Sequence, residues 1–297
     1  MLPTTSPSTA TPQLDGGVSL TCRSLESGYE KKPVLRDVSF TIDEPSVYVV
    51  LGPNGAGKTT LFRTVAGILR PTAGEVLING TPVDRQTSRD HLHYLSHMDG
   101  MPDGLTVGEC LNFYARVERA SAADVERVLD QVEIREFRDT FISKLSAGQR
   151  KRASIARVFL REREIYLMDE PTASLDPKMA REIRTLILNL SRDRIVLYSS
   201  HNLFEAREIG RYVITLKAGR LTLFDRMENV RAAHFIIGVR TLAPSPALEG
   251  WERNGDYYVR ELSGPEQVPA LIQDLAAKGV QVREIREMEN PLEDLFT

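Results

Sequence analysis

The stretch that decides the fold reads Val47-Tyr48-Val49-Val50-Leu51-Gly52-Pro53-Asn54-Gly55-Ala56-Gly57-Lys58-Thr59-Thr60. Its first five residues form a continuous apolar run, which is typical of a strand buried on both faces. The glycine-rich turn that follows fits the pattern G-x-x-x-x-G-K-[ST], and a helical pattern runs from Lys58 to about Leu69. A strand, a loop and a helix in this order predict the opening of a parallel α/β unit.

The turn has the composition of a phosphate-binding loop. Its glycines let successive backbone N–H groups point toward phosphate oxygens, and the helix that follows directs its positive dipole end at the same anion. Lys58 would contact the β- and γ-phosphates, and the Thr59 hydroxyl would ligate Mg²⁺. A chance glycine-rich turn is the competing interpretation, but the flanking strand and helix weigh against it. We therefore predict that the residues from Gly52 to Thr60 bind a nucleotide.

A second apolar strand, Ile165–Met168, ends in the two acids Asp169 and Glu170. Because the carboxyl ends of parallel strands share one edge of the sheet, Asp169 is expected near the phosphate loop. We predict that Asp169 holds Mg²⁺ directly or through water, and that Glu170 orients or deprotonates the attacking water. Two surface acids at the end of an ordinary strand are the alternative, which the phosphate loop disfavours.

The segment Leu145-Ser146-Ala147-Gly148-Gln149 precedes a basic amphipathic helix at Arg150–Leu160. Ser146 is a natural N-cap, and Gly148 leaves backbone N–H groups open to an anion. A helix cap with no ligand would look the same in isolation.

These segments, with Ser174-Leu175-Asp176 and Ser199-Ser200-His201, follow one another in an order that resembles the ATP-binding subunits of ABC (ATP-binding cassette) transporters. The resemblance covers residues 18–225. It implies an α/β P-loop NTPase core of the ABC type, with an antiparallel β subdomain and a helical insertion at about residues 98–160. It also implies ATP and Mg²⁺ as cofactors, and ATP hydrolysis coupled to transmembrane transport.

The same resemblance implies roles for single residues. Ser146, Gly148 and Gln149 would serve a nucleotide bound to a second ATP-binding subunit, so the active form would be a head-to-tail dimer with two ATP molecules. That second subunit would be another copy or a close relative. Asp176 would lie in the loop that crosses the dimer interface, and His201 would contact the γ-phosphate and help to position the water. Glu170, His201 and Lys58 are thus the predicted catalytic residues.

Two further positions carry weaker expectations. Tyr29 matches the aromatic residue that stacks on adenine, although a plain surface aromatic explains it nearly as well. His97 takes the place of a glutamine that in this family ligates Mg²⁺ and senses the membrane partner. Imidazole suits Mg²⁺ less well than oxygen does. We expect His97 to keep a sensing role with a weaker metal contact, which would make hydrolysis or coupling depend on pH.

Composition excludes several classes of protein. The chain has 297 residues, of which 41% are hydrophobic and 27% charged, so wholesale disorder is excluded. A net charge of −3 argues against a broad nucleic-acid surface, and no nucleic-acid partner is expected. No apolar run approaches the roughly 18–20 residues that a membrane helix needs. Cys22 and Cys110 are far apart and are expected to be reduced.

Composition changes toward both ends of the chain. Residues 1–17 are rich in Pro, Ser and Thr, which predicts a disordered tail. Residues 226–297 predict a small α+β domain, with a helix at Gln267–Lys278 and a strand at Val280–Ile285. The final segment, Glu289–Thr297, looks like the ending common in ATPase subunits of ABC-2-type exporters, and an ordinary docking helix is the alternative.

The first functional hypothesis is therefore an ATPase subunit that powers a separate integral-membrane permease, an exporter, from the cytoplasmic face of the cell membrane. A soluble ABC ATPase of translation, repair or cofactor assembly is the second, but neither long coiled-coil arms nor tandem cassettes are present. A regulatory module with vestigial hydrolysis is the third. Its weakness is that Lys58, Asp169, Glu170 and His201 are all intact.

Overall fold

The computed structural model describes residues 17–30, 32–97, 100–173, 175–233, 235–242, 248, 250–262 and 265–288. The predicted N-terminal tail lies outside these residues except for residue 17. The exporter-like ending at residues 289–297 and Ser174 also lie outside them.

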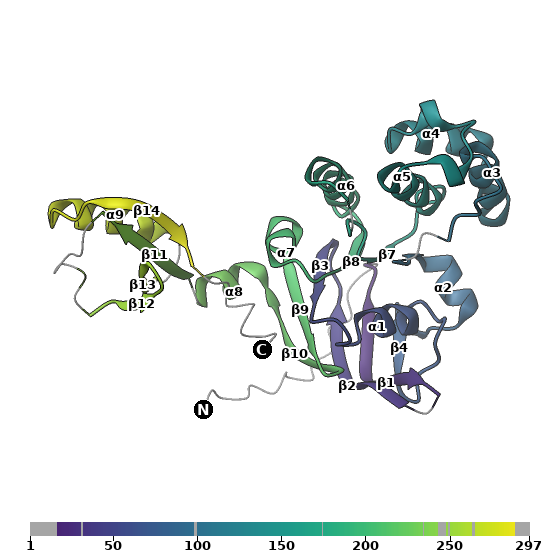
Figure 1. The fold of residues 1–297 in the computed structure, drawn as a ribbon. Helices are drawn as coiled ribbons and strands as arrows, with labels where there is room; N and C mark the ends of the chain where they lie inside the picture. The colour runs from purple at the N-terminus through teal and green to yellow at the C-terminus, as the bar shows by residue number, and fades with distance from the viewer. Residues whose placement is uncertain are drawn as a thin grey trace.

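A six-stranded sheet carries the phosphate loop at its centre (Figure 1). Its strand order is β10-β9-β3-β8-β7-β6. The strands are β3 (Ser46–Leu51), β6 (Leu92–Leu95), β7 (Ile165–Asp169), β8 (Ile195–Ser200), β9 (Tyr212–Lys217) and β10 (Arg220–Arg226). All pairs are parallel except β9 with β10. Every residue of β3, β7 and β8 is buried, as their apolar runs predict, and their carboxyl ends meet at one edge.

A second, antiparallel sheet packs on the first through α1 (Lys58–Val65). Its order is β2-β1-β4-β5, and its strands are β1 (Leu20–Tyr29), β2 (Lys32–Ile42), β4 (Ala73–Ile78) and β5 (Thr81–Pro82). Alternating side chains such as Leu20, Cys22 and Phe40 meet Leu61 and Phe62 of α1 in one core. This is the antiparallel subdomain that the sequence led us to expect.

Helices form the insertion between β6 and β7 (Figure 1). They are α3 (Val107–Glu118), α4 (Ala122–Gln131), the short 3₁₀ turns Arg135–Phe137 and Ile142–Lys144, and α5 (Ala147–Val158). Helix α2 (Arg85–His91) is not part of the insertion and precedes β6. Each of α3, α4 and α5 begins with a reciprocal capping box, which satisfies backbone donors at its first turn. Two further helices, α6 (Pro177–Leu190) and α7 (Leu203–Ile209), share a hydrophobic core with this insertion.

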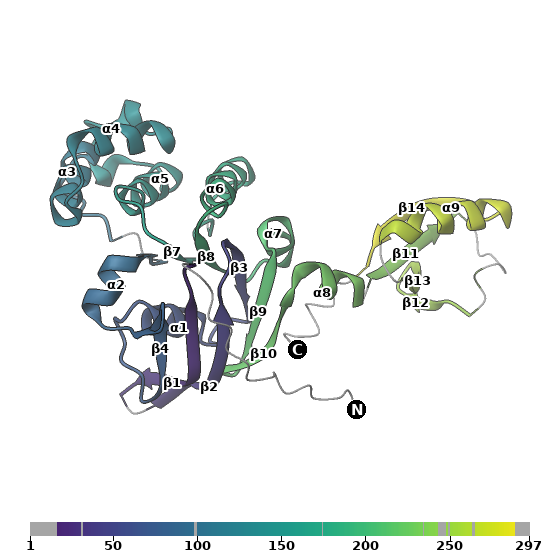
Figure 2. The ribbon, with the colours of Figure 1, turned by 180° about the vertical axis from the view of Figure 1, so that it is seen from behind.

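The C-terminal part forms a third sheet away from the first two (Figure 2). Helix α8 (Met227–Ala233) leads to an antiparallel sheet of order β12-β13-β11-β14. Its elements are β11 (Phe235–Thr241), β12 (Glu252–Asn254), β13 (Tyr257–Leu262), a 3₁₀ turn at Pro265–Gln267, α9 (Val268–Ala277) and β14 (Val282–Glu287). Ile237 and Val239 pack against Leu271 and Leu275 of α9 in a separate small core.

One helix ends earlier than the sequence pattern predicts. Helix α1 ends at Val65 rather than near Leu69, because the Ser88 hydroxyl of α2 donates to the Ala66 carbonyl and Gly67 takes a φ of +67°.

Cys22 and Cys110 are both buried and free, as expected. No helix among the described residues has the length and apolar character needed to span a membrane.

Candidate nucleotide site

The loop between β3 and α1 is packed so closely that two of its glycines have no room for a side chain. A Cβ on Gly52 would lie 2.5 Å from the Leu216 carbonyl oxygen of β9. Gly57 has a φ of +106°, and its Cβ would lie 2.9 Å from Leu35. Within the loop, Pro53, Asn54 and Gly55 are exposed, Ala56 and Thr60 are buried, and Thr59 is half-buried. The loop therefore presents a backbone surface to solvent at the sheet edge.

Lys58 reaches back from the first turn of α1 into this loop. Its Nζ donates to the carbonyl oxygens of Gly52 at 2.6 Å and Pro53 at 3.3 Å, and its side chain is buried. Burial lowers the pKa of Lys58, while the carboxylates of Glu170 and Asp169 act in the opposite direction. A buried ammonium group bonded to neutral carbonyls has charge to offer an incoming anion, which fits a phosphate group.

Asp169 is the last residue of β7 and is only 1% exposed. The Ser199 hydroxyl on the neighbouring strand β8 donates to its Oδ1 at 2.7 Å, and the Tyr94 hydroxyl on β6 donates to its Oδ2 at 3.4 Å. Both carboxylate oxygens are thus held by neutral hydroxyl donors on flanking strands. A buried carboxylate at this edge fits a Mg²⁺ ion that is bound mainly by nucleotide phosphates and one or two protein groups.

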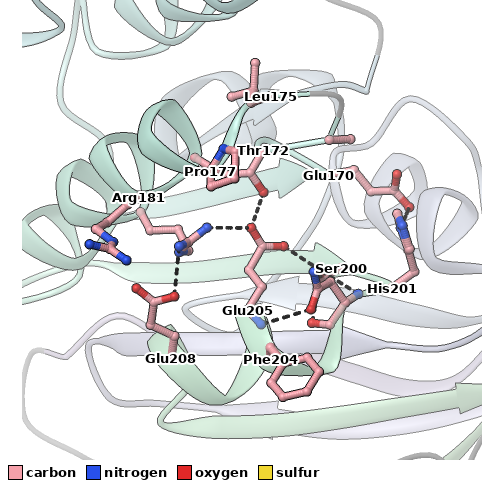
Figure 3. Close-up of a pocket in the computed structure, with 14 residues that line it drawn as sticks. Glu170, Thr172, Leu175, Pro177, Arg181, Ser200, His201, Phe204, Glu205 and Glu208 are labelled. Atoms are coloured by element: carbon pink, nitrogen blue, oxygen red, sulfur yellow. Dashed lines mark hydrogen bonds and ion pairs between the residues drawn. The ribbon is translucent and has the colours of Figure 1, made fainter.

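Glu170 lies between two imidazole rings just beyond β7. His201 Nδ1 lies 3.3 Å from its Oε1, and His97 Nδ1 lies 3.7 Å from its Oε2 (Figure 3 shows the His201 side). Its backbone N–H donates to Ser199 Oγ, and its φ is +47°, a conformation that costs a non-glycine residue about 1–3 kcal/mol and recurs at active sites. The fold therefore aims this carboxylate at the sheet edge despite a backbone cost.

The three histidines that precede α3 have separate partners. His97 lies beside Glu170. His91 Nδ1 lies 2.7 Å from Glu164 Oε2, and His93 Nε2 donates to the Arg161 carbonyl. Within the described residues, no group of three or more His, Cys, Asp or Glu side chains is arranged to hold a metal ion.

A pocket of about 400 Å³ adjoins Glu170 and His201, between α6 and α7 (Figure 3). Glu205 of α7 lines the pocket. It accepts hydrogen bonds from the hydroxyls of Thr172 and Ser200 and from the Arg184 guanidinium of α6. Glu205 thus ties the segment after β7, which follows Glu170, to the turn after β8 that carries His201.

The segment around Ser146 lies at the start of α5 and contacts the start of α6. Ser146 and Gln149 bond reciprocally in the capping box, and a Cβ on Gly148 would lie 2.9 Å from the end of the Met179 side chain. Asp176 caps α6 by accepting from the N–H groups of Lys178 and Met179. These predicted residues share one surface, and no interaction among the described residues joins them to the phosphate loop.

Tyr29 is 39% exposed at the end of β1, and its hydroxyl accepts a hydrogen bond from Arg63 of α1 at 3.1 Å. Sequence reasoning did not single out Arg63, Tyr94 or Glu205. Tyr94 and Glu205 carry no motif, and their positions beside Asp169 and Thr172 depend on contacts between distant segments.

Comparison with known proteins identifies relatives along most of the chain. A family model described as ABC transporter matches residues 35–173. The chain is 27% identical to the uncharacterized ABC transporter ATP-binding protein YxlF of Bacillus subtilis (strain 168) over 292 residues, 93% of this chain and 98% of that one. It is 30% identical to the Nod factor export ATP-binding protein I of Rhizobium meliloti (strain 1021) over 307 residues, 97% of this chain and 90% of that one.

Relatives whose names describe import also match, over smaller shares of the chain. Among solved structures, an ATP-binding subunit of an ABC transporter superposes with a TM-score of 0.66 at 27% identity, covering 71% of this chain and 91% of that one.

Proposed function

The chain belongs to the family of ABC transporter ATP-binding proteins, and we propose from this that it drives a separate membrane permease that exports its cargo. As a member of this family the chain binds ATP with Mg²⁺ and hydrolyses ATP. The observation that carries the proposed site is the meeting of Lys58, Asp169, Glu170 and His201 at the carboxyl edge of β3, β7 and β8.

In this proposal the loop from Gly52 to Thr60 holds the phosphates through its backbone N–H groups and Lys58. Tyr29 stacks on the adenine ring, and Thr59, Asp169 and His97 are the candidate protein groups toward Mg²⁺. The bound ion supplies positive charge to the phosphate oxygens.

Glu170 accepts a proton from water while the water oxygen bonds to the γ-phosphorus and the bond to the β-phosphate oxygen breaks, leaving ADP and inorganic phosphate. His201, 3.3 Å from Glu170, holds that carboxylate and the water in place. The positive φ of Glu170 supports this assignment, because strained backbone recurs at active sites.

A second ATP-binding subunit completes each site in the proposed active form. Ser146, Gly148 and Gln149 begin α5 beside Asp176 at the start of α6, so both segments are presented on one surface. That surface would meet the nucleotide held by the partner subunit, and a head-to-tail pair would form two such sites.

Export rather than import is supported by the share of the chain that is matched. The Nod factor export protein aligns over 97% of the chain, which includes the C-terminal sheet, whereas relatives named for import align over less. We propose that the protein works at the cytoplasmic face of the cell membrane, attached through its permease.

The test is affinity purification of the tagged chain from detergent-solubilised native membranes, followed by mass spectrometry. The proposal expects a stoichiometric partner with several membrane spans. It also expects ATP-driven accumulation of that partner's cargo inside inverted membrane vesicles. Recovery with ribosomal or repair proteins instead would contradict the permease partner, and cargo movement out of inverted vesicles would contradict export.

A further inference from the structure

Two hydrogen-bonded pairs of side chains lie at the proposed nucleotide site. Arg63 of α1 donates from Nη1 to the Tyr29 hydroxyl at 3.1 Å. The Tyr94 hydroxyl of β6 donates to Asp169 Oδ2 at 3.4 Å. The second pair involves the carboxylate that is proposed to face Mg²⁺.

The chemistry of the two groups sets the direction of the second bond. An ionised carboxylate has acceptors only, so the single hydroxyl proton of Tyr94 points at Asp169.

Asp169 is thereby held at both oxygens, by Ser199 of β8 at Oδ1 and by Tyr94 of β6 at Oδ2. Two donors from strands on opposite sides of β7 fix the rotation of the carboxylate plane. Partners of this kind orient a metal-binding group, and their loss typically weakens metal affinity about tenfold or more.

We propose that Tyr94 is a positioning residue for the Asp169 carboxylate, which it holds in the orientation that metal binding requires. This inference rests on the proposed function, in which Asp169 lies toward Mg²⁺.

The test uses Tyr94→Phe, which removes one hydroxyl and keeps the ring. Mn²⁺ binding to the full chain with ADP, followed by electron paramagnetic resonance, is expected to weaken about tenfold. ADP binding in excess EDTA is expected to stay at the parental level, because the proposed role of the hydroxyl acts through Asp169 and the metal ion. Tyr114→Phe is the matched control, since its hydroxyl bonds the Gly100 carbonyl in the helical insertion, and it should bind Mn²⁺ as the parent does.

Parental Mn²⁺ affinity in Tyr94→Phe, or an equal loss of ADP affinity in EDTA, would overturn the positioning role. If the parent itself bound no Mn²⁺ with ADP, the proposed function would fail first.

Discussion

Gly52 is packed so closely against its neighbours that no side chain fits at this position, and the conformation of the phosphate loop depends on this close packing. Its missing Cβ would lie 2.5 Å from a backbone oxygen of β9 and 2.9 Å from Ala56, so neither neighbour is a flexible chain end that can move aside. Glu170 is constrained in a different way, since its backbone is held at positive φ by the N–H bond to Ser199. At both positions a neighbouring strand of the sheet fixes the local geometry, β9 at Gly52 and β8 at Glu170.

Gly52→Ala is expected to displace the loop and to weaken ATP binding by about tenfold, which corresponds to about 1.4 kcal/mol. Titration with a fluorescent ATP analogue measures this. Gly104→Ala is the matched control, because nothing lies within 4 Å of that position. If Gly52→Ala bound ATP as tightly as Gly104→Ala, the close packing of the loop would not matter for binding.

Motif residues of the site could be predicted because each lies at or beyond the carboxyl end of its own strand. Asp169 ends β7, His201 directly follows β8, and Lys58 follows β3 across the phosphate loop, and parallel strands bring such positions to one edge. Tyr94 could not be predicted in the same way, since it is separated from Asp169 by 75 residues and reaches it through pairing of β6 with β7. The metal role predicted for His97 stays a prediction, and the structure adds its contact with Glu170.

At the scale of elements, α6 and α7 are joined by the buried pair of Arg184 and Glu205. Their side chains are 12% and 11% exposed. Glu205 also accepts hydrogen bonds from the hydroxyls of Thr172 and Ser200. Strand β7 beside them was predicted to within one residue from its apolar run. The end of α1 was predicted too late in the chain, although Gly67, which takes a φ of +67° just beyond the helix, is a helix-stop residue that the sequence shows.

Glu205→Gln is expected to destabilise the fold by about 3 kcal/mol, because removing one partner leaves a buried charge poorly compensated. It should also lower turnover, since the turn with His201 loses its anchor. Urea unfolding and an ATPase assay measure the two effects. Glu208→Gln removes the other, half-exposed partner of Arg184 and should cost less than about 1 kcal/mol. Equal effects of the two variants would contradict a special role for Glu205.

His93 of β6 makes the stability of the fold depend on pH. Burial lowers the pKa of His93 to about 4, and nearby arginines act in the same direction. In the unfolded chain His93 has its ordinary pKa near 6.5, so it is protonated below that pH, whereas in the folded chain it stays neutral down to about pH 4. The free energy of unfolding is therefore lost as the pH falls from about 6.5 to about 4. The loss from this one group is on the order of 3 kcal/mol.

His93→Gln keeps a donor for the Arg161 carbonyl and has no charge to gain, so its unfolding free energy should fall less over this pH range. Urea denaturation of parent and variant at several pH values measures the difference. Parallel pH curves for the two proteins would show that His93 is not responsible.

At the scale of the whole molecule, the residues that the proposed function assigns to one complete site lie on two separate surfaces. Lys58, Asp169, Glu170 and His201 gather at the sheet edge, while Ser146, Gly148 and Asp176 lie at the starts of α5 and α6. The C-terminal sheet forms a further body that lies beyond α8 (Figure 1). Arg207 of α7 pairs with Glu287 of β14 at 2.5 Å. In the proposed function, one chain presents two half-sites.

Mixing two inactive variants tests this division. Lys58→Ala and Gly148→Asp should each lack ATPase activity, the first within its own half-site and the second within the half-site that it offers to its partner. In an equal mixture, half of the pairs would contain both variants and one intact site each, so activity should return to about a quarter of the parental level. A mixture as inactive as its components would show that the two segments do not act across subunits.

The most direct measurement is made on Glu170→Gln, with ATP turnover and molecular mass by light scattering determined in the same preparation. The account predicts that this variant binds ATP as the parent does, loses turnover, and accumulates as an ATP-bound dimer that the parent forms only transiently. The change replaces the proton-accepting carboxylate by an amide of the same shape, so the fold is expected to be unaffected. Hydrolysis at the parental rate would contradict the assignment of Glu170, and a monomer in saturating ATP would contradict the proposed dimer.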